Sequence, residues 1–511
     1  MLKNRRKLVT LGVMTGTLLA AMESSIVTTA MPTVVAHLGG LSIYSWVFSI
    51  YILTSTITMP IWGKMSDLYG RGIAYQLSIS VFLLGSILSG ASTSMTDLII
   101  FRAIQGIGAG GLVPLALTIT GELYSLQERG KMQAIFSSVW AVSSLIGPLL
   151  GGFLTDTISW RAIFYINIPF GLAAAVIIGF AMPASKKKDE KPSIDVAGAV
   201  TLSAAISLLL IACLQESGNF SALRTFGALF LSIVFIVAFI KVEQRSREPL
   251  LPLPLFREKL FVAGVLSNLF SGCAVLGSVS FIALFAQGVL GKSATEVGTV
   301  FMPLMFGWVL FSVLAGRLLL RWSYKSLAVS GMVLLTSGFA LLAFSAAETN
   351  ITPLYVGVGI VGMGMGLSMF TILMTLQSRL PGRHLGVVTS SILFFRNIGS
   401  SLGAGIMGAL MNSKLITGLM IAQKETSGTI SSDIAKIAAN INIAIEPVSR
   451  ATLSEASLSY FRSSLSLGLH SVFLFSLVIA LGAFASVLFL PSGTVVKEKS
   501  ISDSSVARTA E

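Results

Sequence analysis

The stretch "GKMSDLYGRG", residues 63–72, decides the fold, because a second version of it occurs later in the chain. The degenerate copy "GRLLLRWSYK" starts at residue 316, an offset of 253 residues. A second pair of segments, "SSVWAVSSLIGPLLGG" from residue 137 and "SSILFFRNIGSSLGAG" from residue 390, has the same offset. Two motifs that agree on one offset indicate that the chain contains an internal structural repeat.

The composition indicates a membrane protein. Of the 511 residues, 54% are hydrophobic and only 11% are charged, whereas a soluble domain has about 25% charged residues. A membrane helix needs about 20 mostly apolar residues. The first such run resembles a secretory signal, but it continues to Pro32 and we interpret it as an uncleaved helix. The fourteen predicted spans lie at 8–31, 44–63, 73–94, 98–122, 132–154, 162–183, 194–214, 222–241, 260–288, 297–316, 326–346, 352–377, 386–411 and 464–490.

The net charge of +13 has two possible causes, nucleic-acid binding or membrane topology. Most Lys and Arg residues fall in the loops of one face if both termini are cytoplasmic, which is the asymmetry expected of membrane proteins. The charge is therefore spread over many loops, and we expect no nucleic-acid partner. Cys213 and Cys273 lie in apolar runs and predict neither a disulfide nor a metal site.

The repeat predicts an all-α membrane protein with fourteen transmembrane helices, built as two six-helix halves with two inserted helices between them. Halves related in this way are typical of secondary transporters, whose substrate site lies between them. The predicted parts are an N-terminal half at 1–185, the inserted helices at 186–258, a C-terminal half at 259–490 and a cytoplasmic tail at 491–511. An external loop with short helices is expected at 412–463.

Three motifs of the first half suggest moving parts. Gly63 and Gly70 permit a tight turn, and Asp67 with Arg71 either forms a latch that changes partners between two states or belongs to a solvated loop. In "FRAIQGIGAGG", Arg102 either faces a partner in the membrane or extends to the interface, and Gln105 is a candidate cavity residue. The segment "GPLLGG" bends and flattens a helix, either for packing only or as the place where one half moves, through Gly147, Pro148, Gly151 and Gly152.

These motifs, together with "WRAIFYINIPFG" (160–171), resemble the fourteen-helix drug:proton antiporter family of the major facilitator superfamily. The resemblance implies the major facilitator fold, antiport rather than symport, and first and fourth helices that both line a central cavity. The acidic residue of the family's first-helix motif, usually Asp, corresponds here to Glu23 in "MESSIVTTAMP". The longer side chain and the following Ser-Ser depart from that motif and leave the substrate open.

Glu23 is the carboxylate that we expect to couple transport to protons. It lies about 23 Å into the first helix, and Arg102 lies about 6 Å from the other end of its helix, so both fall at a similar depth. Burial favours the neutral form of a carboxyl group, whereas a nearby arginine favours the charged form. Glu23 tuned by Arg102 is therefore the predicted proton or substrate site. The alternatives are a permanently neutral carboxyl group or an ion pair that only holds the helices.

The other polar and aromatic candidates are scattered over the spans. Trp140, Phe285 and Trp308 are candidates for an adaptable apolar cavity, although packing or lipid contact would explain each alone. Arg396 is the best polar candidate of the C-terminal half, as an anion-sensing or a gating residue. No cofactor or metal is expected, because the driving force would be the proton gradient.

The predicted function is export of amphipathic small molecules, such as drugs or toxic compounds, by proton-coupled antiport with alternating access. The alternative within transport is a dedicated exporter of one metabolite, siderophore or amino acid. An enzyme or sensor is disfavoured, since we find no nucleophile–base pair, metal cluster or phosphate-binding loop in the sequence. We expect a monomer in the cytoplasmic (inner) membrane, with protons, lipid and a small-molecule substrate as its partners.

Overall fold

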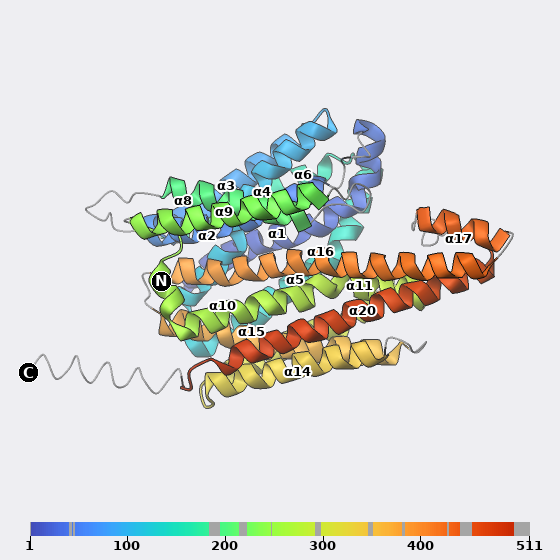
Figure 1. The fold of residues 1–511 in the computed structure, drawn as a ribbon. Helices are drawn as coiled ribbons and strands as arrows, with labels where there is room; N and C mark the ends of the chain where they lie inside the picture. Colours follow the sequence, from blue (N-terminus) through green and yellow to red (C-terminus); the bar gives the residue numbers. More distant parts are fainter. Residues whose placement is uncertain are drawn as a thin grey trace, which may run out of the picture.

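The computed structural model describes residues 2–39, 43, 46–182, 195–213, 222–246, 248–291, 298–345, 351–380, 384–426, 429–439 and 452–494. This part of the chain consists of helices (Figure 1). The N-terminal half contains α1 (Leu2–Leu38), α2 (Trp46–Tyr69), α3 (Arg71–Gly90), α4 (Met95–Leu123), α5 (Leu126–Thr157), α6 (Ala162–Tyr165) and α7 (Asn167–Ala181). The two inserted helices are α8 (Val196–Cys213) and α9 (Ala222–Arg245).

The C-terminal half follows a short 3-10 helix, η2 (Leu253–Arg257). Its first span runs from Lys259 to Val289 and contains two π-helical segments. The elements are α10 (Lys259–Ser271), η3 (Gly272–Leu276), α11 (Gly277–Leu284), η4 (Phe285–Val289), α13 (Met302–Leu318), α14 (Tyr324–Ser345), α15 (Thr352–Arg379), α16 (Leu385–Glu425), α17 (Thr429–Ala439) and α20 (Glu455–Leu488).

Within the described residues, twelve helices are long and apolar enough to cross a membrane. The other two predicted spans correspond to α5 and to α8, which is a shorter apolar helix. The all-helical membrane architecture is therefore confirmed, and a count of fourteen fits this arrangement. The predicted boundaries at 185 and 186 and most of the tail lie outside the described residues.

The internal repeat is visible in the packing of the two halves. In the first half α4 packs between α2 and α3, and in the second half α15 packs between α13 and α14. Glycines bring the backbones together at both places. A Cβ on Gly106 would lie 2.6 Å from the Tyr51 carbonyl oxygen of α2, and one on Gly362 would lie 2.1 Å from the Leu304 carbonyl oxygen of α13. Gly106 and Gly362 correspond at an offset of 256 residues and permit the same close helix contact in the two halves.

The segment 412–463 differs from the expected loop. Helix α16 continues without a break to Glu425, and α20 already begins at Glu455, so the two helices run side by side past the bundle with α17 against them (Figure 1). The reason lies in the sequence after residue 411. Leu415, Leu419 and Ala422 recur at helical spacing and are buried, so the apolar face continues beyond the membrane-length segment.

The inserted helices attach to both halves. Helix α8 packs against α2 and α16, and α8 and α9 pack against each other. Beyond the end of α9, Glu248 forms an ion pair with the buried Lys64 of α2, at 2.7 Å. Lys64 belongs to the same motif as Asp67, so the insertion contacts the N-terminal half where we predicted a latch.

Candidate functional site: a buried ion pair and an inter-half latch

Glu23 and Arg102 form an ion pair in the interior of the N-terminal half. The Glu23 side chain on α1 is fully buried, and Arg102 on α4 is 1% exposed. The second carboxylate oxygen of Glu23 accepts a hydrogen bond from Asn167 Nδ2 on α7, at 2.8 Å. Three helices thus converge on one carboxylate.

Arg102 has further partners that fix its position. Its guanidinium donates to Gln105 Oε1 at 2.7 Å and to the carbonyl oxygen of Val47 at 3.3 Å. It also lies over the ring of Tyr51, 4.2 Å from the ring centre, which adds a cation–π contact. Arg102 therefore does not extend to the interface, and its charge is compensated within the protein.

A residue of α3, Ser86, completes this hydrogen-bond network. Ser86 Oγ accepts hydrogen bonds from Asn167 Nδ2 at 2.9 Å and from Gln105 Nε2 at 3.3 Å. The neighbouring Gly85 makes this possible, because a Cβ there would lie 2.3 Å from the Gln105 backbone nitrogen. Buried polar groups that are satisfied in this way rigidify a structure and are costly to disrupt one at a time.

Sequence reasoning missed three members of this network. Asn167, Ser86 and Tyr51 were not among the candidate site residues. An amide at the start of an apolar span was the available signal, since a buried amide must find partners. Nothing in the sequence marks Ser86, because serines occur throughout these spans.

The Gly-Pro motif of α5 packs directly against α1 beside this network. A Cβ on Gly147 would lie 2.0 Å from Ser25 Oγ, and one on Gly151 would lie 2.7 Å from the Ile26 carbonyl oxygen. Gly152 is less crowded, with its nearest atom at 3.8 Å, and Pro148 is exposed within the continuous helix. Any movement of α5 along α1 would thus act on the turn that follows Glu23.

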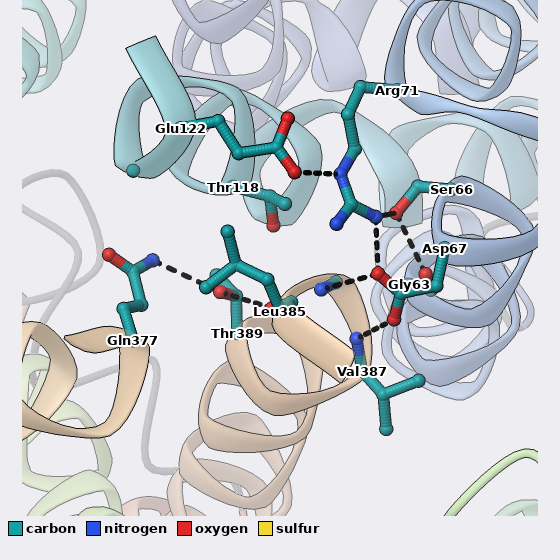
Figure 2. Close-up of polar contacts among 12 residues, drawn as sticks. Gly63, Ser66, Asp67, Arg71, Thr118, Glu122, Gln377, Leu385, Val387 and Thr389 are labelled. Atoms are coloured by element: carbon teal, nitrogen blue, oxygen red, sulfur yellow. Dashed lines mark hydrogen bonds and ion pairs between the residues drawn. The ribbon is translucent and has the colours of Figure 1, made fainter. Parts of the chain in front are cut away.

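The predicted latch joins the two halves (Figure 2). Both oxygens of Asp67 at the end of α2 accept hydrogen bonds from the first turn of α16, from the backbone nitrogens of Gly386 and Val387, each at 2.9 Å. A carboxylate at a helix N-terminus interacts favourably with the helix dipole and with unpaired N–H groups. Arg71 pairs with Asp67 and also donates to Glu122 Oε1 at 2.7 Å.

Two glycine crossings lie at this end of the molecule, which we call the Asp67 end. A Cβ on Gly63 of α2 would lie 2.7 Å from the Gly386 carbonyl oxygen of α16. A Cβ on Gly130 of α5 would lie 3.1 Å from Gly316 Cα of α13. Gly63 and Gly316 are equivalent in the repeat, so the crossings are related by its symmetry. The two halves therefore contact each other closely at the Asp67 end. Gly70, with φ of 94°, supplies the turn between α2 and α3.

Gly130→Val is expected to reduce transport roughly tenfold or more, because the added methyl groups would meet the backbone of α13 and overpacking costs about 1–3 kcal/mol. The measurement is the initial rate of substrate movement in vesicles with equal amounts of protein. Gly227→Val is the matched control, since no atom lies within 4 Å of its Cβ position. A normal rate for Gly130→Val would show that this contact is not needed.

The remaining predicted cavity residues have different surroundings. Phe285 is buried and its ring contacts Phe473, at 5.7 Å between centres, so it belongs to the core of the C-terminal half here. Trp308 is half-buried against the same core, and Trp140 on α5 is 39% exposed. Arg396 of α16 is half-buried, and its Nε has no hydrogen-bond partner.

The family model of the Major Facilitator Superfamily matches residues 13–404. The chain is a member of this superfamily. The multidrug transporter protein MdtP of Bacillus subtilis is 35% identical over 414 residues, which cover 81% of this chain and 76% of that protein. Multidrug resistance protein 3 of the same organism is 34% identical, and the match covers 96% of both chains. The predicted class, a membrane transporter rather than an enzyme, is confirmed by this membership.

Solved structures support the fold. The proton:xylose symporter XylE superimposes with a TM-score of 0.56 at 13% identity, over 97% of this chain and 98% of that one. The human organic anion transporter MFSD10 gives a TM-score of 0.56 at 14% identity, over 93% of this chain and 99% of that one. The major facilitator fold implied by the resemblance is therefore confirmed, and the chain is a multi-pass membrane protein.

Proposed function

We propose that this major facilitator transporter exports amphipathic small molecules in exchange for protons, with Glu23 as the proton-binding group. The observation that carries the proposal is the fully buried carboxylate of Glu23, held by Arg102 and Asn167 in the N-terminal half. An ionisable group at such a position is costly and in membrane proteins usually serves ion or proton movement. The similarity to two multidrug transporters supports export of drug-like compounds.

The proton step follows from the partners of Glu23. In the arrangement seen here, Arg102 and Asn167 donate hydrogen bonds to both carboxylate oxygens of Glu23. A proton binds when α1 and α4 move apart and the carboxyl group loses Arg102. When the pair closes again, the proton leaves. A ligand that occupies the space between these helices in the open state takes the place of the proton, so proton and substrate are bound in turn.

The gating step uses the latch. While Asp67 accepts the two N–H groups of α16, the halves stay together at the Asp67 end. Opening this end breaks both hydrogen bonds, and Arg71 keeps the released carboxylate paired. Each state therefore has its own set of contacts, as alternating access requires. We propose that the Asp67 end is cytoplasmic, in agreement with the basic loops, and that the protein works as a monomer in the cytoplasmic membrane.

The test is expression in a host without its own pumps, with growth measured against cationic, zwitterionic and anionic amphiphiles. Each compound that becomes less toxic is then added to inverted vesicles with an imposed pH gradient, and a pH-sensitive dye reports proton movement. Protection accompanied by substrate-driven proton efflux from the vesicles supports the proposal. Protection against a single compound would favour the dedicated exporter. Transport of the substrate without proton movement would refute antiport.

A further inference from the structure

Arg396 is a charged side chain in the membrane-spanning part of the C-terminal half, and the described residues provide no partner of opposite charge. Its Nε is buried without a hydrogen-bond partner, and the described residues give it no ion pair. The residues from 259 to 424 include two acids, Glu296 and Glu348, and both lie outside the described residues. Arginine keeps its charge in proteins. This half therefore holds a cation whose charge the described residues leave uncompensated, in contrast to Arg102.

The depth of Arg396 places it far from both membrane surfaces. It follows the first residue of α16, Leu385, by 11 positions, or about 16 Å along the helix axis. The hydrocarbon layer is about 30 Å thick. A side chain at this depth cannot easily reach the polar head groups, so its cost must be offset within the protein or by a ligand.

The helix faces show where the side chain lies. Gly399 and Gly403 contact the α10 and η3 backbone, whereas Ser390 and Asn397 contact α2 of the other half. At about 100° per residue, Arg396 lies on the arc between these two faces. Thr389 lies on the same arc and accepts a hydrogen bond from Gln377 of α15, at 3.0 Å (Figure 2). Arg396 is thus on the side of α16 that faces the junction of the two halves.

The neighbouring backbone is shaped around this arginine. Gly272 begins the π-helical segment η3, and a Cβ there would lie 3.0 Å from Arg396 Cγ and 2.1 Å from the Arg396 carbonyl oxygen. π-helical turns are rare and occur frequently at functional sites. Arg396 as a residue is half-buried rather than fully buried, so the surrounding helices do not enclose it completely.

We propose that Arg396 binds an anionic group of the substrate, so that the transporter selects amphiphiles carrying a carboxylate or a similar planar anion. A guanidinium forms two parallel hydrogen bonds to a carboxylate, which gives orientation as well as attraction. The N-terminal half, where Glu23 and Arg102 neutralise each other, carries the proton. This inference rests on the proposed transport function and names the class of substrate that would be transported.

The test compares the binding of two dyes to the purified protein by fluorescence polarisation. Rhodamine 110 has a free carboxylate, and rhodamine 123 is its methyl ester, so the pair differs in one charge. The wild-type protein is expected to bind rhodamine 110 at least tenfold more tightly. Arg396→Gln is expected to remove this preference while binding of the ester changes little, and Arg396→Lys is expected to retain part of it because the charge remains without the planar fork.

Lys414→Gln is the control, since it removes an exposed positive charge from the same helix and should leave the preference intact. Equal binding of both dyes by the wild-type protein would overturn the inference, and so would an unchanged preference in Arg396→Gln. If that variant fails to fold, the wild-type preference and its reduction in Arg396→Lys decide the question. No proton gradient is used, so a failure of proton-driven export would refute the proposed function alone.

Discussion

Glu23→Gln is expected to reduce substrate-driven proton movement to the background of empty vesicles. The amide that replaces the carboxylate cannot bind and release a proton in the working pH range. Glutamine keeps nearly the same shape, and its oxygen can still accept the hydrogen bond of Asn167. Substrate binding should therefore remain measurable, which separates a role in coupling from a role in packing.

The control for Glu23→Gln addresses folding. Removing one partner of a buried ion pair costs about 3–5 kcal/mol, because Arg102 would keep a buried charge without its counter-ion. The double variant Glu23→Gln/Arg102→Gln removes both charges and is expected to be more stable than the single variant, but equally uncoupled. Retained proton movement in either variant would show that another group carries the proton.

Asp67→Asn is expected to open the Asp67 end. Hydrogen bonds to a charged group contribute about 1.5–3 kcal/mol. The asparagine amide loses that charge and has an NH2 donor in place of one of the two oxygens that accept the N–H groups of α16. A loss of about 2 kcal/mol shifts the ratio of closed to open molecules roughly thirtyfold, since every 1.4 kcal/mol is tenfold. Transport should fall because the cycle then remains mostly in one state.

The expected shift from closed to open molecules in Asp67→Asn can be measured directly. Spin labels on the exposed residues Lys131 of α5 and Arg321 beyond α13 report the distance between the halves, in a background without Cys213 and Cys273. The distance distribution of Asp67→Asn should move to longer values. Glu122→Gln is the control, since it removes the 41% exposed partner of Arg71 and leaves the contact to α16 intact. Overlapping distributions for Asp67→Asn and the wild type would refute the latch.

The sequence and the structure agree best for charged residues, because such side chains have few possible environments inside a membrane protein. Glu23 and Arg102 were paired from their similar depth and from the resemblance, which implied that the first and fourth helices line one cavity. Asp67 with Arg71 was a candidate for a latch, and Asp67 contacts both Arg71 and the first turn of α16. Arg396 was also found from the sequence, but the absence of a counter-ion for it among the described residues was not.

Other features could not be predicted from the sequence. The Phe285 ring was a candidate for a cavity and instead packs against Phe473, because an aromatic residue suits a core as well as a binding site. The length of α16 was missed because hydropathy ends where the membrane ends, whereas a helix ends where its buried face ends. The network residues Ser86 and Asn167 became visible only once α3 and α7 were placed beside α1.

The sequence by itself determined that the protein lies in a membrane, that it contains an internal repeat and to which superfamily it belongs. It also identified the charged residues whose burial in a membrane costs too much free energy to occur without a role. These properties depend on composition and spacing, which are local to the chain. Only the tertiary structure decided which partners those residues have, because pairs such as Glu23 and Arg102 are separated by 79 positions and Asp67 and Gly386 by 319. Whether a buried charge is neutralised, shared between two halves or left for a ligand depends on that pairing.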